Sequence, residues 1–342
     1  MPDHSTPRAI IKSLLRGEPP QQPLLMPIIF SLGARLENLP QREFQSNPTK
    51  ITNALRQIRS VLKVDGVTCY FDPYLEAEAL GCKREWIADG SCRLISPPFS
   101  NTDDLRRQLT SPDSLADKGH IQVACQVIQR LKVMLKDEPA LISHVTGPFT
   151  LATQLLGGAT ASAPLDAVEF AAEATAAVSK SFLEAGADVV VLREDCLPEF
   201  SPETCRWYAS LLAPIANVIR FYEALPVLFL GAEALSRENQ AAIADCDWDL
   251  ALCRPIPGAS HQLEPWPSTR SLGIGYALSP QVFDRNLMNS GALDNLSRLA
   301  PSLFLTSFED LPSTSNIPQL TDGLRAIRQL FEQQQPLSHP GS

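Results

Sequence analysis

The sequence lacks any surplus of positive charge. Its 342 residues include 29 Lys and Arg against 38 Asp and Glu, which gives a formal net charge of -9 at pH 7. Proteins that bind nucleic acid through charge need a basic surface to neutralise the phosphates. The composition therefore argues against a nucleic-acid partner and favours a small-molecule substrate.

Long apolar runs are also missing. No stretch approaches the roughly 18 apolar residues that a bilayer span requires. The first ten residues show no basic region followed by an apolar core, as a secretory signal would. We therefore expect no membrane partner and a cytoplasmic location.

Motifs for metals and nucleotides are scarce. The chain has five His and eight scattered Cys, with no C-x-x-C, and Cys246 and Cys253 do not converge with histidines at metal spacing. We expect reduced, mostly buried thiols and no zinc site, while a site made of carboxylates alone stays open. The G-x-x-x-x-G-K-[ST] loop, the G-x-S-x-G elbow and a G-x-G-x-x-G turn after a strand are absent, so nucleotide chemistry has no support.

What the sequence does contain is a regular alternation of β-type and helical patterns. Eight mostly apolar runs are typical of buried strands, at residues 24–30, 66–72, 140–147, 188–194, 226–231, 250–255, 271–276 and 302–307. Helical spacing separates most of them, which predicts an α/β fold: a single parallel (β/α)8 TIM barrel. An open doubly wound sheet is the alternative.

Helices are predicted by apolar residues three and four positions apart. A short entry helix stops at Gly17. The other helices are expected near 49–63, 121–136, 165–185, 202–222, 235–244, 280–298 and 316–334, and Gly186 is expected to end the one at 165–185. Residues 83–120 break the alternation with polar and Pro-rich turns, which predicts an insertion after the second strand that forms a rim or lid. We expect one domain over 1–342, with the barrel at about 23–335 and a flexible tail at 336–342.

The active site of such a barrel lies at the C-terminal ends of the strands. Polar residues at these ends are Asp72, His144, Thr146, Glu194, Asp195, Glu233, Arg254, Tyr276, Glu309 and Asp310. Carboxylates crowded in one mouth would raise one another's pKa toward values that suit proton transfer, or would bind a cation. The alternative is that each carboxylate caps a helix or faces water, and that His144 is a hydrogen-bonded core residue.

Five segments match motifs of a known family. They are R-x7-R-G-E-x3-Q-P (8–23), DGVTCYFDPYLEAEALGC (65–82), HVTGPFTLATQLLGG (144–158), EAGADVVVLRED (184–195) and the strand at Pro226. In this order, over nearly the whole chain, they resemble the uroporphyrinogen decarboxylase superfamily, and the chain is identified as a divergent member. The resemblance implies a (β/α)8 barrel.

The resemblance also implies two classes of chemistry. The decarboxylases of that family remove acetate carboxyls from a tetrapyrrole without a cofactor, in porphyrin biosynthesis. Their relatives move methyl groups to or from corrinoids or thiols with zinc. A homodimer is expected because the family often forms one.

Site residues carry over from the family one by one. Asp72 resembles the aspartate that binds the pyrrole N–H groups, and Arg35 is the one arginine near the position of the family's arginine loop. Gln154 stands at the tyrosine position, and Glu309 where a late histidine is expected. The zinc ligands of the methyltransferases are missing, since the chain reads VLFLGAE (227–233) and SLGIGYALSP (271–280) there.

These departures bear on the choice of reaction. A substrate with eight carboxylates needs bidentate cations, whereas Asp72, Glu194, Asp195 and Glu309 would give the mouth negative charge and repel it. We predict catalytic roles for Asp72, His144, Glu194 and Glu309, substrate contacts from Arg35, Gln154, Asp195, Arg254 and Tyr276, and no metal or resident cofactor.

Three hypotheses follow. The first is a decarboxylase-like lyase that acts on a tetrapyrrole or another small carboxylated ligand, with Asp72 stabilising the protonated ring. The second is a methyltransferase that works with a corrinoid, or with a corrinoid protein, without the usual zinc ligands; Glu194, Asp195 or Glu309 would then handle the proton. The third is a barrel that binds a ligand without catalysis.

Overall fold

The computed structural model describes most of the chain. The described residues are 6–18, 23–87, 90–96, 99–108, 112–136, 138–157, 163–195, 197, 201–231, 248–254, 256–257, 263–264, 273–286, 296 and 304–333.

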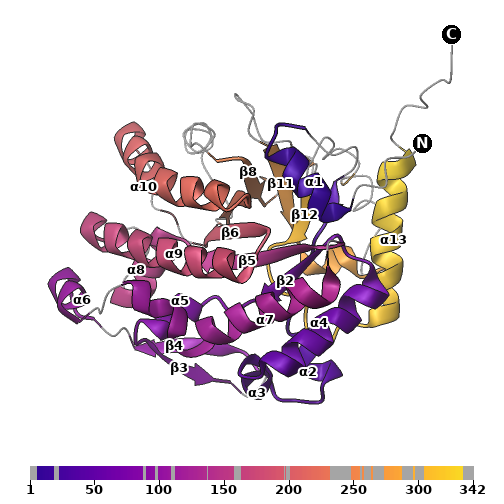
Figure 1. Ribbon diagram of the computed structural model, residues 1–342, viewed down its shortest axis with the longest axis horizontal. Helices are drawn as coiled ribbons and strands as arrows, with labels where there is room; N and C mark the ends of the chain where they lie inside the picture. The colour runs from indigo at the N-terminus through magenta and orange to yellow at the C-terminus, as the bar shows by residue number, and fades with distance from the viewer. Residues whose placement is uncertain are drawn as a thin grey trace, which may run out of the picture.

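Eight parallel strands form a nearly closed barrel with helices around it (Figure 1). The strands are β1 (Leu24–Leu25), β2 (Gly66–Tyr70), β5 (Ala140–Thr146), β6 (Val189–Glu194), β7 (Leu225–Leu230), β8 (Leu250–Cys253), β11 (Gly273–Leu278) and β12 (Phe304–Ser307). Their order is β1-β12-β11-β8-β7-β6-β5-β2. All eight overlap the predicted runs, so the barrel is confirmed against the open sheet.

The barrel closes where β1 meets β2. The backbone N–H of Asp65 donates to the carbonyl of Leu25 at 3.0 Å, and the Asp65 carboxylate accepts from the N–H of Leu25 at 2.8 Å. At this seam a carboxylate therefore accepts a hydrogen bond that a backbone carbonyl would accept in a ladder of paired strands. Arg328 from the last helix donates to the other carboxylate oxygen at 3.1 Å and ties the C-terminal region to the seam.

Alternation along each strand divides the side chains between two hydrophobic layers. In β6, Val189 and Val191 belong to the cluster inside the barrel, whereas Val190 and Leu192 belong to the cluster under the helices. Because both layers are apolar, the strands read as continuous apolar runs.

Five long helices cover the outside of the barrel, as predicted: α4 (Pro48–Leu62), α7 (Gly119–Leu135), α9 (Leu165–Ala185), α10 (Pro202–Phe221) and α13 (Ile317–Gln333). Asn47 and Ser201 cap α4 and α10 by accepting from the backbone N–H three residues on, and a proline follows each cap. Gly186 ends α9 in the left-handed region, at φ 109°, as expected.

Outside the insertion, four short helices of five to nine residues were not predicted. They are α2 (Leu32–Leu36), α3 (Gln41–Gln45), α5 (Leu75–Ala79) and α8 (Pro148–Leu156). Three of them, α2, α5 and α8, follow the ends of β1, β2 and β5 and therefore border the expected site.

The insertion between β2 and β5 is confirmed. It contains an antiparallel hairpin of β3 (Lys83–Trp86) and β4 (Cys92–Ser96), then α6 (Thr102–Gln108) and a 3₁₀ helix η1 (Pro112–Asp117). Whether it closes over the site stays a prediction. A second small antiparallel pair, β9 (Ile256–Pro257) and β10 (Leu263–Glu264), follows β8.

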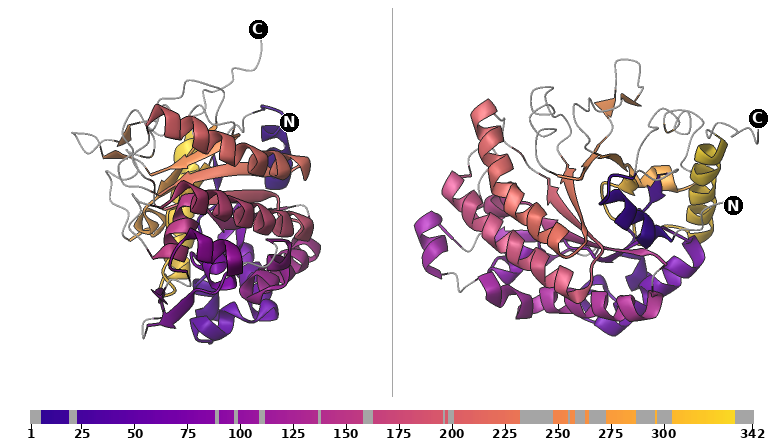
Figure 2. Two further views of the ribbon diagram at one scale, coloured as in Figure 1. Left: turned by 90° about the vertical axis from the view of Figure 1, so that its left-hand side faces the viewer. Right: turned by 45° about the horizontal axis from the view of Figure 1, so that its top comes forward.

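The N-terminal end of the barrel is covered by the entry helix α1 (Pro7–Leu14), which Figure 2 shows against the ring of strands. Ile11 is buried in the interior cluster beside the first residues of several strands, such as Ala140 and Leu225. Arg8 anchors the helix through an ion pair with Asp188 at 2.8 Å. The interior is therefore closed at this end, which leaves the C-terminal ends of the strands for a ligand.

Several predictions lie outside the described residues: the helix near 235–244, the tail at 336–342, Glu233 and Cys246. Of the helix expected at 280–298, the structure describes a 3₁₀ helix η3 (Pro280–Phe283), residues 284–286 and residue 296. Within the described segments, we find no helix that is both long and apolar enough to span a bilayer.

Candidate active site

Six side chains meet at the C-terminal mouth of the barrel. We call this group the mouth cluster; it consists of Phe71, His144, Arg193, Phe229, Arg254 and Phe308. Each residue lies within two positions of the C-terminal end of a barrel strand, namely β2, β5, β6, β7, β8 and β12 respectively. The parallel sheet brings them together because all its strands end on the same side.

Arg193 is the buried cation of the cluster, with 8% of its surface exposed. Its guanidinium lies 4.0 Å from the ring centre of Phe229 and 5.3 Å from that of Phe71. One terminal nitrogen donates to Asp195 at 3.0 Å and to the carbonyl of Phe308 at 2.9 Å. Burial lowers the pKa of Arg193 from its usual value, an effect that the nearby charges of Asp195 and Glu309 oppose.

The His144 side chain points into the barrel. It lies level with Val191, two residues closer to the N-terminal end of the barrel than Arg193. Its Nε2 lies 3.4 Å from the hydroxyl of Thr68, and its ring meets Phe71 edge to face with 5.3 Å between centres. Burial, with a smaller contribution from the charge of Arg193, holds the pKa of His144 well below its usual range. The imidazole is therefore neutral near pH 7.

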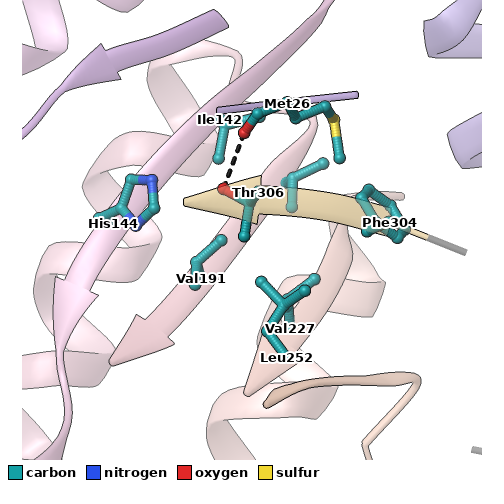
Figure 3. Close-up of a pocket in the computed structure, with 9 residues that line it drawn as sticks. Met26, Ile142, His144, Val191, Val227, Leu252, Phe304 and Thr306 are labelled. Atoms are coloured by element: carbon teal, nitrogen blue, oxygen red, sulfur yellow. Dashed lines mark hydrogen bonds between the residues drawn. The ribbon is translucent and has the colours of Figure 1, made fainter. Parts of the chain in front are cut away.

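A cavity of about 20 Å³ lies in the barrel below this level, with His144 and Thr306 among the side chains that line it (Figure 3). Its other walls are apolar, including Met26 and Val191, and Thr306 donates to the carbonyl of Met26 at 2.8 Å. The volume suits about one water molecule. A substrate would thus sit above it, in the mouth.

Asp72 lies at the expected place but is fully engaged. One carboxylate oxygen accepts from the N–H of Tyr74 at 3.0 Å, and the other accepts from Arg84 at 2.5 Å. The Asp72 side chain is 0% exposed. Arg84 comes from β3 of the insertion and also donates to Glu78, next to His120. The insertion therefore neutralises the carboxylate that the sequence placed at the centre of the chemistry.

Glu194 is fully buried on the outer face of β6, away from the barrel interior. One oxygen accepts from the N–H of Phe149 at 3.0 Å and from Tyr208 at 2.6 Å; the other accepts from the N–H and hydroxyl of Thr150 at 2.9 and 2.7 Å. Burial raises its pKa to about 7. These bonds satisfy the N-terminus of α8, where a carboxylate is favoured.

Gly147 makes this arrangement possible. A Cβ atom at this position would lie 2.3 Å from the carboxyl carbon of Glu194, which no side chain tolerates. The first turn of α8 can therefore approach the buried carboxylate only with glycine here.

Asp195 and Glu309 lie on the rim of the mouth, and both are exposed. Asp195 binds Arg193, as described above, and Glu309 directly follows Phe308. Arg254 stacks over the Phe308 ring at 4.0 Å and donates to the carbonyl of Gly231 at 3.3 Å. Of the predicted residues, the mouth thus gathers His144, Asp195, Arg254 and Glu309.

The other predicted contacts lie elsewhere. Arg35 is exposed and donates to the carbonyl of Ser315, just before α13. Gln154 on α8 donates to the carbonyl of Pro73 at 3.0 Å, next to Asp72. Tyr276 is buried in the layer between barrel and helices. For these three the structure supplies structural contacts, and a role with substrate stays a prediction.

The expected excess of negative charge in the mouth is wrong for the described residues. Asp72 is paired with Arg84, and Glu194 lies on the outer face. In the mouth, two arginines face Asp195 and Glu309, so the formal charges of these four side chains balance. The sequence could not show this, because Arg84 reaches Asp72 from the inserted hairpin and Arg254 comes to the mouth from a different strand.

Donors for a metal do not gather in the part of the chain that the structure describes: no group of three or more His, Cys, Asp or Glu side chains is placed to hold an ion. Burial raises the pKa of Cys253, the cysteine at the end of β8, well above its usual value. The described residues do not fit the family's zinc site.

Comparison with known proteins decides the family. The family model for uroporphyrinogen decarboxylase (URO-D) matches residues 6–235, more than half of the chain. The chain belongs to the URO-D family. The mouth cluster residues Phe71, His144, Arg193 and Phe229 all fall within the matched segment.

Relatives of this URO-D family member include methyltransferases. A methylated-thiol–coenzyme M methyltransferase of Methanosarcina mazei is 27% identical over 139 residues, which is 41% of this chain and 36% of that protein. The match thus spans little more than a third of the curated relative. The solved structure of a methyltransferase from Methanosarcina mazei superposes with a TM-score of 0.76 at 16% identity, covering 96% of this chain and 99% of that one. At that identity the likeness shows the fold.

Arg193 is the residue that sequence reasoning missed. The strand-end rule selected Glu194 and Asp195, the last residues of the apolar run. Alternation from Val189 and Val191 places Arg193 on the inward face, but the two faces of a fully buried strand are both apolar. The one available signal was an arginine inside an otherwise apolar run.

Proposed function

We propose that this URO-D family member is a methyltransferase that exchanges a methyl group between a small substrate and a corrinoid carried by a partner protein. The observation that carries the proposal is the state of Asp72. Both of its oxygens are occupied by groups of the chain itself, and its side chain is inaccessible. Its counterpart in the decarboxylases binds pyrrole N–H groups, so tetrapyrrole decarboxylation loses its central contact.

The relatives support the same choice. The curated relative and the superposed structure both carry methyltransferase names, and the structural likeness extends over nearly both chains. The corrinoid is a second substrate in this proposal, carried by another protein, and supplies the methyl-accepting or methyl-donating centre. The C-terminal end of the barrel is where such a partner would present it.

A methyl transfer takes up or releases a proton, and side chains in the mouth can carry it. When a methylated thiol gives its methyl group to the corrinoid, the carbon–sulfur bond breaks, a carbon–cobalt bond forms and the sulfur takes up a proton. In the reverse direction the thiol releases that proton as the thioether forms. Asp195 and Glu309 on the rim are exposed carboxylates that can pass a proton between substrate and water. His144 is neutral near pH 7, so it serves as a hydrogen-bond partner and does not add charge.

The test is methyl transfer with free corrinoids. Purified protein is incubated anaerobically with methylcobalamin and a panel of small thiols, and the absorption spectrum reports loss of the methyl–cobalt bond while chromatography detects the thioether. We expect thioether formation that depends on protein. The Asp195→Asn and Glu309→Gln variants should lower the rate, whereas Glu169→Gln, an exposed carboxylate on α9, should not.

A parallel incubation with uroporphyrinogen separates the alternatives. Porphyrins with fewer carboxyls would overturn the proposal in favour of decarboxylation. Binding of thiols without product in either assay would indicate a ligand-binding barrel.

A further inference from the structure

Two buried nitrogen atoms in the mouth have no partner among the described residues: Nε of Arg193 and Nδ1 of His144. They lie on the neighbouring strands β6 and β5, where His144 is in register with Val191 and Arg193 with Thr146. Arg193 is therefore one inward step above His144. Both side chains contact the ring of Phe71.

Both atoms can donate a hydrogen bond. Nε of a guanidinium always carries a hydrogen. When the hydroxyl of Thr68 donates to Nε2 of His144, the neutral ring carries its hydrogen on Nδ1. Buried donors in native proteins are almost always paired, so a pair of open donors indicates a group that the protein binds.

We propose that Nε of Arg193 and Nδ1 of His144 bind one oxygen of a carboxylate or sulfonate, so that the substrate is a small organic anion. Asp195 and the Phe308 carbonyl take one terminal nitrogen of Arg193 and fix the plane of the guanidinium. Phe71 and Phe229 flank that plane and would pack against the apolar body of the ligand.

The surroundings suit a single negative charge. Arg254 adds a second cation at the mouth, while Asp195 and Glu309 balance the two arginines. A ligand with many carboxylates would meet the two rim carboxylates, whereas a monoanion can place its one charge at the buried guanidinium. Burial keeps His144 uncharged, so it contributes a donor without a charge.

This inference rests on the proposed function only for the position of the site, and its test needs no methyl transfer. The probes are butyrate, butanesulfonate and the neutral isostere butyramide, none of which has a methyl group on a heteroatom. Thermal unfolding is followed at constant ionic strength as each probe is added. A ligand that binds the folded state raises the apparent Tm in proportion to the logarithm of its concentration.

We expect butyrate or butanesulfonate to raise the apparent Tm and butyramide to have no effect. Arg193→Met should abolish the shift, and His144→Phe should weaken the apparent affinity about tenfold, since each removes a donor to the anion. Arg325→Met is the matched control: this arginine is exposed on α13, pairs with Asp322 and should leave the shift unchanged.

Two results would overturn the inference. One is an equal shift with butyramide, or no shift with either anion, in the wild-type protein, an outcome that holds even if the variants fail to fold. The other is a full butyrate shift in folded Arg193→Met, which would place the anion elsewhere. Methyl transfer without anion binding would leave the proposed function standing, and anion binding without methyl transfer would leave this inference standing.

Discussion

Glu194 offers a direct test of how a strand-end carboxylate is used in this barrel. Sequence reasoning gave it a catalytic role, whereas its two oxygens accept four hydrogen bonds on the outer face of β6. The substitution Glu194→Gln keeps the shape of the side chain. It replaces one oxygen by an NH2 group. Because both oxygens of Glu194 accept hydrogen bonds, the NH2 group faces donors in either orientation of the amide.

The size of the effect follows from the contacts. Each oxygen accepts from one backbone N–H and one hydroxyl. A hydroxyl can rotate to accept from the new NH2 group, but a backbone N–H cannot, so the amide leaves one buried N–H without its acceptor. A hydrogen bond to a charged group contributes about 1.5 to 3 kcal/mol. At roughly 2 °C per kcal/mol for a chain of this size, the apparent Tm should fall by about 3 to 6 °C.

The assay is thermal unfolding by circular dichroism at one scan rate, with Glu169→Gln as the control. The control residue is an exposed glutamate on α9 and should change the apparent Tm by less than about 1 °C. If Glu194→Gln melts with the wild type and loses methyl transfer, the structural reasoning is refuted and Glu194 is catalytic.

Two further predictions concern pH and the insertion. Burial raises the pKa of Glu76 and Glu194 to about 7, so their contribution to stability is fully present below the unfolded value near 4.5 and is lost as pH rises through 7. The lowered pKa of His144 has the opposite effect on stability. Its contribution is present above about pH 6.5, the unfolded value, and is lost as pH falls. Because two carboxyls outweigh one imidazole, the apparent Tm should fall as pH rises from about 5 to 7, and a Tm that rises across this interval would contradict this. Arg84→Met leaves the buried Asp72 without its cation and should lower the free energy of unfolding by about 3 to 5 kcal/mol in urea titrations, while adding Asp72→Asn should restore most of the loss; a neutral single variant would show that the pair does not hold the insertion.

The strands and long helices of this protein could be predicted from the sequence because their signals are local. A parallel strand with both faces buried is a short apolar run, and an amphipathic helix repeats its apolar residues at three and four positions. The caps Asn47 and Ser201 and the stop at Gly186 are equally local. The short helices α2 and α3, of five residues each, were not predicted because one or two turns leave too little periodicity to detect.

The candidate site was predicted only in part. The C-terminal ends of the strands are fixed by the barrel, so His144, Asp195, Arg254 and Glu309 were found at the mouth from their position in the chain. The apolar pattern of a fully buried strand does not show which of its two faces points into the barrel, and a shift of one residue exchanges the faces. For that reason Glu194 was chosen where Arg193 occupies the mouth.

The sequence by itself thus determined the fold class, the family and the positions of the strand ends, because these depend on the pattern of apolar residues and on motifs along the chain. Only the tertiary structure decided which charges neutralise one another. Arg84 reaches Asp72 from an inserted hairpin, and Glu194 binds the first turn of α8, more than forty positions earlier in the chain. Charge pairing depends on distances in space, and those arise only when the barrel has closed.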